Sequence, residues 1–313
     1  MKKKTSVIIP TLNAEKVLTR LIESLKAQIL FPFEILIVDS SSDDKTVEIA
    51  VLLGCKVYVI DRDKFDHGGT RKLASSVVSG DILVLLTQDV LLRDNKAIEK
   101  LIQPFDSDKS IAVTYGRQLP FEDADPISYH LRLFNYTKES LLKSIDDIPV
   151  LGIKTVFCSN SFAAYKKSIL NEIGNFPENI IFGEDMYVAA KMILAGYKIA
   201  YAADAKVYHS HNYTLIQDFR RSFDVGVFHS RESWLQKEFG KAEKEGREYI
   251  VSLFRQIGLR RPCWIGRAFL VLFAKITGYR LGRIEKYLPL LLKKYLSMNP
   301  KYWQSQPQLP NTQ

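Results

Sequence analysis

The feature that most constrains this chain is a regular alternation of apolar runs and helical segments over its first 86 residues. The apolar runs are rich in β-branched residues and have the length of buried strands: 6–9, 34–38, 56–60 and 81–86. Helices are predicted between them: 15–28, 46–53 and 70–78. Apolar strands separated by helices predict a parallel sheet that is covered on both faces. Ligands of such sheets bind at the carboxyl ends of the strands.

Beyond residue 120 the alternation stops. One helix, over 129–142, is predicted within 120–149, and 154–203 returns to a mixed strand and helix character. From Tyr213 onward the sequence predicts mostly helices, with aromatic and basic residues interleaved. A length of 313 residues exceeds the usual single domain, so one large domain with an appendage is expected.

The positive charge is concentrated near the carboxyl terminus. Eleven basic residues and one acid lie between Ile250 and Lys301, which leaves −1 of the net +9 to the rest of the chain. Apolar runs at 268–274 and 288–292 are cut by charge far short of the roughly 20 residues that a membrane-spanning helix needs. The pattern favours either helices lying on an anionic membrane surface or a helical cap with a solvated basic face. No recognition motif supports a nucleic-acid partner.

Cysteine use and the amino terminus indicate the compartment. The three cysteines, Cys55, Cys158 and Cys263, are an odd number without C-x-x-C spacing, which argues against a disulfide framework and a thiolate zinc site. The four-residue apolar run that ends before Pro10 is too short for a signal peptide or an anchor. A cytoplasmic protein is predicted.

Polar residues follow three of the predicted strands and should share one rim of the sheet. They are Pro10, Thr11 and Asn13 after the first strand, Asp39 and Asp43 after the second, and Thr87, Gln88 and Asp89 after the fourth. Asp39 is suited to accept a hydrogen bond from a nucleobase or a ribose hydroxyl, and Asp89 to bind a divalent cation that bridges a diphosphate. Each loop alone is explained equally well by capping and turn preferences. Three such loops on one rim favour a site.

A second polar cluster lies between the third and fourth strands. Paired glycines at 68–69 would let backbone amides approach a phosphate, and Arg71 offers a fork of donors for its oxygens. A turn that opens a helix explains the glycines too, but not Asp66, His67 and Arg71 around them.

Acids and histidines occur further along the chain. Glu184 and Asp185 open an amphipathic helix, where they either stabilise its dipole or supply a general base toward a sugar hydroxyl. His209 and His211 follow an apparent strand and should point to the same side. Such a pair is either half of a metal site with Asp89 or a pair of exposed polar residues.

Taken together, the segments 7–13, 39–43, 87–89 and 183–185 resemble family 2 glycosyltransferases of the GT-A fold, over about residues 5–235. The resemblance implies an α/β fold: a Rossmann-like mixed sheet of the nucleotide-diphospho-sugar transferase type, with a helical, basic, membrane-associating extension. It divides the chain into a catalytic domain over 1–240 and a basic amphipathic helical region over 241–313. The nucleotide-sugar half would cover about 1–120 and the acceptor half about 121–240.

A narrower resemblance is to the rhamnosyltransferase branch, which uses dTDP-L-rhamnose, and rests on 65–71, 86–89 and 209–211. The segments 278–282 and 288–303 are similar to the tails of those enzymes. The predicted function is inverting transfer of L-rhamnose to a polyprenyl-diphosphate-linked saccharide, in synthesis of O-antigen, capsule or cell-wall rhamnan. The protein would act as a peripheral enzyme on the inner leaflet of the plasma membrane. Another UDP- or dTDP-sugar remains an alternative donor.

The resemblance also implies residue roles. The nucleotide sugar would contact Pro10, Thr11, Asn13, Asp39, Asp66, His67, Gly69, Arg71, Gln88 and Asp89. Asp89 and His209, with His211 as a substitute, would hold Mg²⁺ or Mn²⁺, although Thr87 replaces the first acid of the family's D-x-D element. Asp185 would be the catalytic base, with Glu184 beside it. Asn160, Arg220 and Arg221 are predicted acceptor contacts.

Two other functions compete with this one. A nucleotidyltransferase would carry a glycine-rich loop directly after the first strand, where this chain has Pro10 to Asn13. A noncatalytic membrane-associated scaffold is favoured by Thr87 but opposed by Arg71, Glu184 and Asp185.

Overall fold

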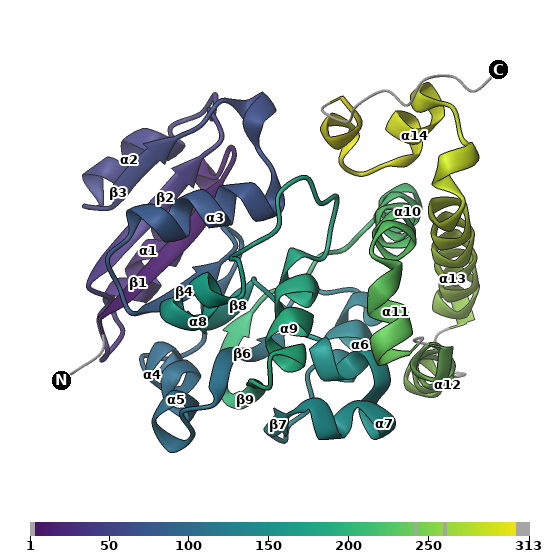
Figure 1. Cartoon of the computed structure of the whole chain (residues 1–313). Helices are drawn as coiled ribbons and strands as arrows, with labels where there is room; N and C mark the ends of the chain where they lie inside the picture. Colours follow the sequence, from purple (N-terminus) through teal and green to yellow (C-terminus); the bar gives the residue numbers. More distant parts are fainter. Residues whose placement is uncertain (1–3, 241–242, 259–261, 305–313) are drawn as a thin grey trace.

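A computed structural model of the chain describes residues 4–240, 243–258 and 262–304. Its first half contains the predicted parallel strands, β1 (Thr5–Thr11), β2 (Glu34–Asp39), β3 (Lys56–Val59) and β4 (Ile82–Leu86), in the order β3-β2-β1-β4. These strands form the purple and blue end of the sheet in Figure 1. The side chains of β4 are all buried, as expected for a strand with helices on both faces.

The second half of the chain extends the same sheet. β8 (Phe162–Lys166) lies antiparallel to β4, and β6 (Ile111–Leu119), β9 (Lys198–Tyr208) and β5 (Leu91–Leu92) follow in that order. β7 (Leu141–Lys143) pairs with β9. The sheet is therefore mixed, and the predicted α/β fold is confirmed.

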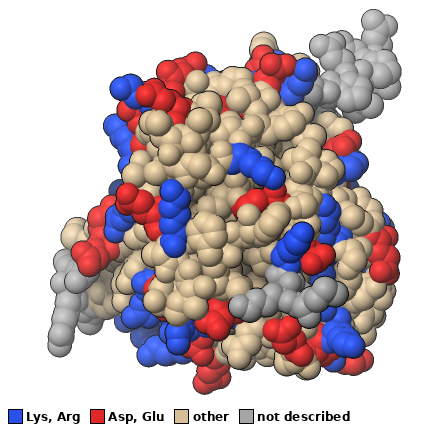
Figure 2. Space-filling view, turned by 90° about the vertical axis from the view of Figure 1, so that its left-hand side faces the viewer, with Lys and Arg blue, Asp and Glu red and all other residues tan. Residues whose placement is uncertain are grey.

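Helices cover both faces of the sheet. The apolar core on one face includes residues of α1 (Glu15–Lys26), α2 (Thr46–Leu52), α4 (Ala97–Ile102) and α5 (Pro104–Ser107). The core on the other face includes residues of α3 (His67–Val77), α8 (Lys167–Glu172), α9 (Glu184–Leu194), α10 (Leu215–Arg231) and α11 (Ser233–Phe239). On the face over the amino-terminal half, Lys, Arg, Asp and Glu are interspersed (Figure 2).

Two predicted helices have wrong boundaries. The helix predicted at 129–142 is α6 (Pro126–Asn135), because Asp125 caps it through the amides of Ile127 and Ser128 and proline occupies the first helical position. α3 begins at His67 rather than at residue 70, because the Asp66 carboxylate accepts from the Gly69 amide. The pair at 68–69 is therefore helical and does not form a separate turn.

Short helical segments lead into the carboxyl-terminal region. α7 (Ile148–Leu151) and a 3₁₀ turn (Gly152–Val156) precede β8. The region itself contains α12 (Glu243–Ile257), α13 (Pro262–Arg283), α14 (Leu290–Leu296) and a 3₁₀ turn (Pro300–Trp303). Tyr302 and Trp303 are buried in the core on the α9 face of the sheet. Arg260 and Arg261, two of the eleven basic residues counted in this region, and the last nine residues lie outside the described residues.

α13 packs closely along α10, and the two helices lie side by side in Figure 1. Gly278 and Gly282 face the backbone carbonyls of Phe219 and Phe223, with no room for a Cβ. The region thus caps the main body, while part of α13, including Phe273, stays exposed. None of the helices in the described ranges has both the length and the apolar character needed to cross a bilayer.

Candidate active site

The loops after β1, β2 and β4 are joined at the carboxyl edge of the parallel strands. The Thr11 hydroxyl donates to Asp39 Oδ1 over 2.9 Å. Asn13 Oδ1 accepts from a backbone amide of the loop after β2. Gln88, from the loop after β4, exchanges two hydrogen bonds with the backbone of Leu12. The three loops that the sequence predicts on one rim are therefore cross-linked there.

Asp39 has no solvent-exposed surface, and both of its carboxylate oxygens are engaged. Oδ1 accepts from the hydroxyls of Thr11 and Ser42, and Oδ2 accepts from the Ser42 amide. A carboxylate offers about four acceptor positions, so room for one further donor remains. Asp39 fixes the rim, and its contact with a nucleoside stays a prediction.

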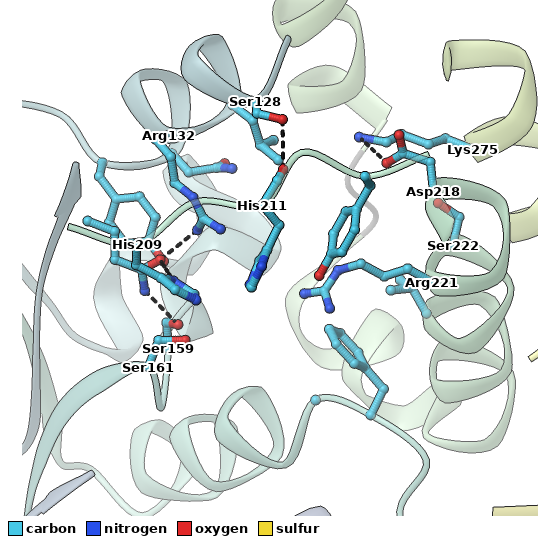
Figure 3. Close-up of a pocket in the computed structure, with 18 of the residues that line it drawn as sticks. Ser128, Arg132, Ser159, Ser161, His209, His211, Asp218, Arg221, Ser222 and Lys275 are labelled. Atoms are coloured by element: carbon cyan, nitrogen blue, oxygen red, sulfur yellow. Dashed lines mark hydrogen bonds and ion pairs between the residues drawn. The ribbon is translucent and has the colours of Figure 1, made fainter. Parts of the chain in front are cut away.

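A cavity of about 530 Å³ opens beyond this rim, between the sheet and helices α6, α9, α10 and α13. Asp89, Asp185, His209 and His211 all line it. Cationic side chains also line it: Arg132, Arg221, Arg267 and Lys275. Figure 3 shows several of these residues converging from α6, α10, α13 and the end of β9. The predicted residues Asp89, Asp185, His209 and Arg221 are thus brought together.

Asp89, His209 and His211 form a cluster with metal-ligand chemistry. The Nε2 atoms of both histidines lie 3.3 Å from Asp89 Oδ2, and one ligand atom from each residue falls within 4.8 Å of the others. The two histidines follow β9 and point to the same side, as predicted. A carboxylate and two imidazoles are a donor set for a divalent cation.

Gln118 orients the buried histidine of this cluster. Its Oε1 lies 2.8 Å from His209 Nδ1 and accepts from Arg132 Nη1 over 2.6 Å. Its Nε2 donates to Ser159 Oγ, which fixes the amide plane. Because a carbonyl oxygen faces Nδ1, that nitrogen carries the proton and Nε2 presents its lone pair toward Asp89.

The ionisation of the cluster also suits a cation. Burial disfavours the charge on Asp89, but when His209 is protonated, its hydrogen bond and its charge outweigh burial and hold the pKa of Asp89 well below its usual range. Burial lowers the pKa of His209, and burial together with neighbouring His209 lowers the pKa of His211 to about 4. An ionised carboxylate and two neutral imidazoles are the protonation states that ligate a metal.

Asp185 opens α9 and faces the cavity with its carboxylate. Its Oδ1 accepts from the Met186 amide and its Oδ2 from the Asn160 amide. Burial, with the adjacent charge of Glu184, raises the pKa of Asp185 to about 7. A carboxylate with this pKa can accept a proton near neutral pH.

Glu184 does not line the cavity. It is buried, forms an ion pair with Arg71 at 3.2 Å, and accepts from Asn160 Nδ2. Burial opposes its charge, but Arg71 outweighs burial and lowers the pKa of Glu184. The pKa of Asp185, which faces the cavity, is therefore higher than that of the adjacent Glu184.

Several predicted contacts lie away from the cavity walls. Arg71 is buried beneath the site and also donates to the His67 carbonyl. The Gly69 amide is occupied by Asp66, whose carboxylate also accepts from the Asn179 amide. Asn160 is buried between Glu184 and Asp185, and its neighbours Ser159 and Ser161 line the cavity instead.

Of the two arginines of α10 that are predicted to contact the acceptor, only Arg221 lines the cavity. Arg221 lines the cavity with its guanidinium over the rings of Phe182 and Tyr213, at 4.9 and 5.9 Å. Arg220 lies over the Tyr295 ring of α14 instead. Sequence reasoning missed Gln118 and Arg132. The signal for Gln118 was its place near the end of the apolar run 111–119, whose carboxyl end joins the same rim.

Comparison with solved structures identifies the fold. A mannosyltransferase, PcManGT from Pyrobaculum calidifontis, in complex with GDP-Man and Mn²⁺, superposes with a TM-score of 0.64 at 14% identity and covers 92% of this chain and 89% of its own. TarS 1–349 of S. aureus in complex with UDP-GlcNAc superposes with a TM-score of 0.53 at 18% identity, over 90% of this chain and 91% of its own. The fold is thus that of GT-A nucleotide-sugar transferases.

Sequence comparison identifies the family. The model for glycosyl transferase family 2 matches residues 6–174. The O-antigen chain rhamnosyltransferase RfbN of Salmonella typhimurium strain LT2 is 47% identical, over 96% of each chain. WbaN of Salmonella anatum, also an O-antigen chain rhamnosyltransferase, is 46% identical over 95% of each chain. The chain belongs to glycosyl transferase family 2 and is a glycosyltransferase.

Proposed function

We propose that the protein transfers L-rhamnose from dTDP-L-rhamnose to a lipid-linked saccharide during cell-surface polysaccharide synthesis, with inversion at the anomeric carbon. The observation that carries the chemistry is the cavity itself, in which the basic Asp185 carboxylate shares walls with the Asp89, His209 and His211 cluster. The assignment of rhamnose as the sugar is based on the two rhamnosyltransferases that resemble this chain over nearly its full length.

The reaction is a single displacement. Asp185 accepts the proton of the acceptor hydroxyl as that oxygen attacks the anomeric carbon, and the bond from this carbon to the nucleoside diphosphate breaks. The Asp185 carboxylate accepts hydrogen bonds from the backbone amides of Asn160 and Met186, which hold it in place. The raised pKa makes Asp185 a better proton acceptor than an ordinary aspartate.

Asp89, His209 and His211 would hold Mg²⁺ or Mn²⁺ on the donor side of the cavity. Two imidazoles in the set favour Mn²⁺ over Mg²⁺, which prefers oxygen ligands. The bound cation would supply electrostatic stabilisation of the departing diphosphate. Thr87, which replaces an acid in the D-x-D element, lines the cavity beside Asp89.

The donor would lie along the rim of β1, β2 and β4. Pro10, Thr11, Asn13, Asp39, Gln88 and Asp89 of these loops would contact the nucleotide. Asp66, His67, Gly69 and Arg71 do not line the cavity, and Arg71 keeps Glu184 ionised. Arg221, Ser159 and Ser161 line the acceptor side.

A donor panel tests the assignment. Purified protein receives dTDP-L-rhamnose, UDP-glucose, UDP-galactose or UDP-N-acetylglucosamine, with Mn²⁺ or with EDTA, and release of nucleoside diphosphate is measured. We expect turnover of the rhamnose donor alone and its loss in EDTA. Preferential turnover of a UDP-sugar would agree with the family assignment but contradict rhamnose as the donor sugar. No turnover of any donor, also with a lipid-linked acceptor present, would support a noncatalytic scaffold.

The base assignment is tested by Asp185→Asn. We expect transfer to fall by about 10² to 10⁴-fold while donor affinity is retained, because only proton transfer is removed. Asp204→Asn, whose side chain is largely exposed on β9, is the matched control and should keep full activity. Near wild-type turnover by Asp185→Asn would show that another group is the base.

A lipid-linked acceptor would place the protein at the cytoplasmic face of the inner membrane. Support comes from the basic, partly apolar carboxyl-terminal helices, whose exposed residues include Phe273 and Leu291. Anionic headgroups and the acceptor diphosphate both attract lysine and arginine.

A further inference from the structure

An apolar groove on the outer side of α10 and α13 adjoins the catalytic cavity. It measures about 590 Å³ and is lined by Thr214, Leu215, Ile216, Phe219, Arg267, Phe273, Ala274 and Thr277. Ile216 and Phe273 have 55% and 71% of their surface exposed, so the groove is open along its length. Apolar side chains that are left this open on paired helices indicate an apolar ligand.

The groove and the cavity meet at Arg267, which lines both. Different faces of α10 line the cavity and the groove. Asp218 and Ser222 of α10 line the cavity, whereas Ile216 and Phe219 of the same helix line the groove. A ligand that extends from the cavity along α13 therefore passes from polar to apolar surroundings at Arg267.

Arg267 lacks a carboxylate partner among the described residues. Its Nη2 donates to the Tyr213 carbonyl over 3.4 Å, its guanidinium lies over the Trp264 ring at 5.7 Å, and its buried Nε has no hydrogen-bond partner there. Arg221, on the same side of the cavity, is likewise held over aromatic rings rather than paired with an acid. Arg267 lines both the groove and the cavity, and Arg221 lines the cavity, each without a carboxylate partner among the described residues. This arrangement favours an anion joined to a hydrocarbon chain.

We propose that this groove binds the first isoprenoid units of the lipid-linked acceptor and that Arg267 binds the acceptor diphosphate where groove and cavity meet. The inference rests on the proposed function and adds a site for the lipid to it. The saccharide would then extend inward toward Asp185, so one continuous surface would hold the lipid, the diphosphate and the reacting hydroxyl.

The test compares three acceptors that carry one hexose: a methyl glycoside, a methyl diphosphate ester and a diphosphate ester with two isoprene units. The hexose is whichever of galactose, glucose and N-acetylglucosamine the wild-type protein glycosylates. The readout is the ratio of kcat/KM values between acceptors on one preparation, which cancels any difference in the folded fraction.

We expect Phe273→Ser to lower the ratio of isoprenoid to methyl diphosphate acceptor by about tenfold, because it removes an apolar wall of the groove. Phe269→Ser is the matched control. Phe269 lies one turn earlier on α13 and is 61% exposed, but it does not line the groove, so the ratio should stay at the wild-type value. Arg267→Gln should lower the ratio of methyl diphosphate to methyl glycoside by about tenfold.

Each other outcome overturns the inference. An unchanged isoprenoid ratio in Phe273→Ser excludes the groove, and an equal fall in Phe269→Ser assigns the effect to general lipid contact by α13. An unchanged diphosphate ratio in Arg267→Gln removes Arg267 from the site. If the wild-type protein glycosylates none of the acceptors with dTDP-L-rhamnose, the proposed function itself has failed.

Discussion

At the scale of single residues, the surroundings of two adjacent carboxylates shift their pKa values in opposite directions. Glu184 is neutralised by Arg71 at 3.2 Å, whereas Asp185 receives only backbone amides and faces the cavity. Burial acts on both acids. The direct ion pair with Arg71 outweighs it at Glu184, whereas burial and the charge of Glu184 prevail at Asp185. Environments that push neighbouring pKa values apart are the usual means of assigning a catalytic base.

This arrangement predicts the pH dependence. As the proposed base, Asp185 must be ionised to accept a proton, so kcat should rise with pH through about 7, the pKa of Asp185. Glu184→Gln removes a negative charge that raises this pKa, so the rising limb of the kcat–pH profile should move to lower pH. Glu178→Gln, which breaks an exposed ion pair with Lys72, is the control and should leave the limb in place. A limb that stays near 7 in Glu184→Gln would contradict the coupling.

Gln118 offers a second prediction at this scale, because it contacts His209 but is not a ligand itself. Gln118→Leu should weaken Mn²⁺ binding by about 10 to 100-fold, since the His209 ring loses the acceptor that fixes its protonation. Calorimetric titration with Mn²⁺ measures this effect, and Gln103→Leu, at an exposed site near α5, is the control. Equal affinities in the two variants would show that His209 needs no orienting partner.

At the scale of elements, the contact between α10 and α13 determines where the cavity walls lie. Glycines on both helices allow the backbones to touch: Gly226 on α10, and Gly278 and Gly282 on α13. Arg221 and Lys275, which line the cavity from the two helices, are positioned by this contact. The close approach therefore belongs to the site as well as to the stability of the fold.

Substitution of these glycines should separate the helices. Gly282→Ala places a methyl group against the Phe223 carbonyl and should lower the free energy of unfolding by about 1 to 3 kcal/mol, as overpacking does. Gly266→Ala lies on the same helix with open space around it, so it should raise stability by about 0.5 to 1 kcal/mol through helix propensity. Urea unfolding of both variants measures the difference, and a shift of the same sign in both would refute the close packing.

The elements also show what sequence can and cannot predict. β1, β2 and β4 are predictable because burial on both faces leaves uninterrupted apolar runs, and the loops after them follow directly. The sequence misplaces the end of α6, because aromatic residues continue at helical spacing past Asn135, whereas the chain leaves the helix there and forms β7. The position of Gln118 at the end of 111–119 places it on the rim, but the roles of Gln118 and Arg267 depend on partners distant in sequence, which the sequence does not show.

At the scale of the whole molecule, charge and exposed apolar surface occur together at the carboxyl-terminal end. α13 and α14 lie along one side in Figure 1. Exposed cations there include Arg280 and Lys286, and exposed apolar side chains include Leu291, at 81%. Cations beside apolar side chains are the combination that binds anionic lipid surfaces.

The protein should therefore bind vesicles of phosphatidylglycerol more tightly than vesicles of phosphatidylcholine, as measured by co-sedimentation. Raising NaCl to about 0.5 M should remove most of the difference, because salt screens the attraction between exposed charges. Leu291→Ser should weaken binding to the anionic vesicles by about tenfold through lost apolar burial. Val150→Ser is the matched control, since Val150 is equally exposed, at 81%, but lies on α7 outside this region. If the two variants bound alike, α14 would not contact lipid.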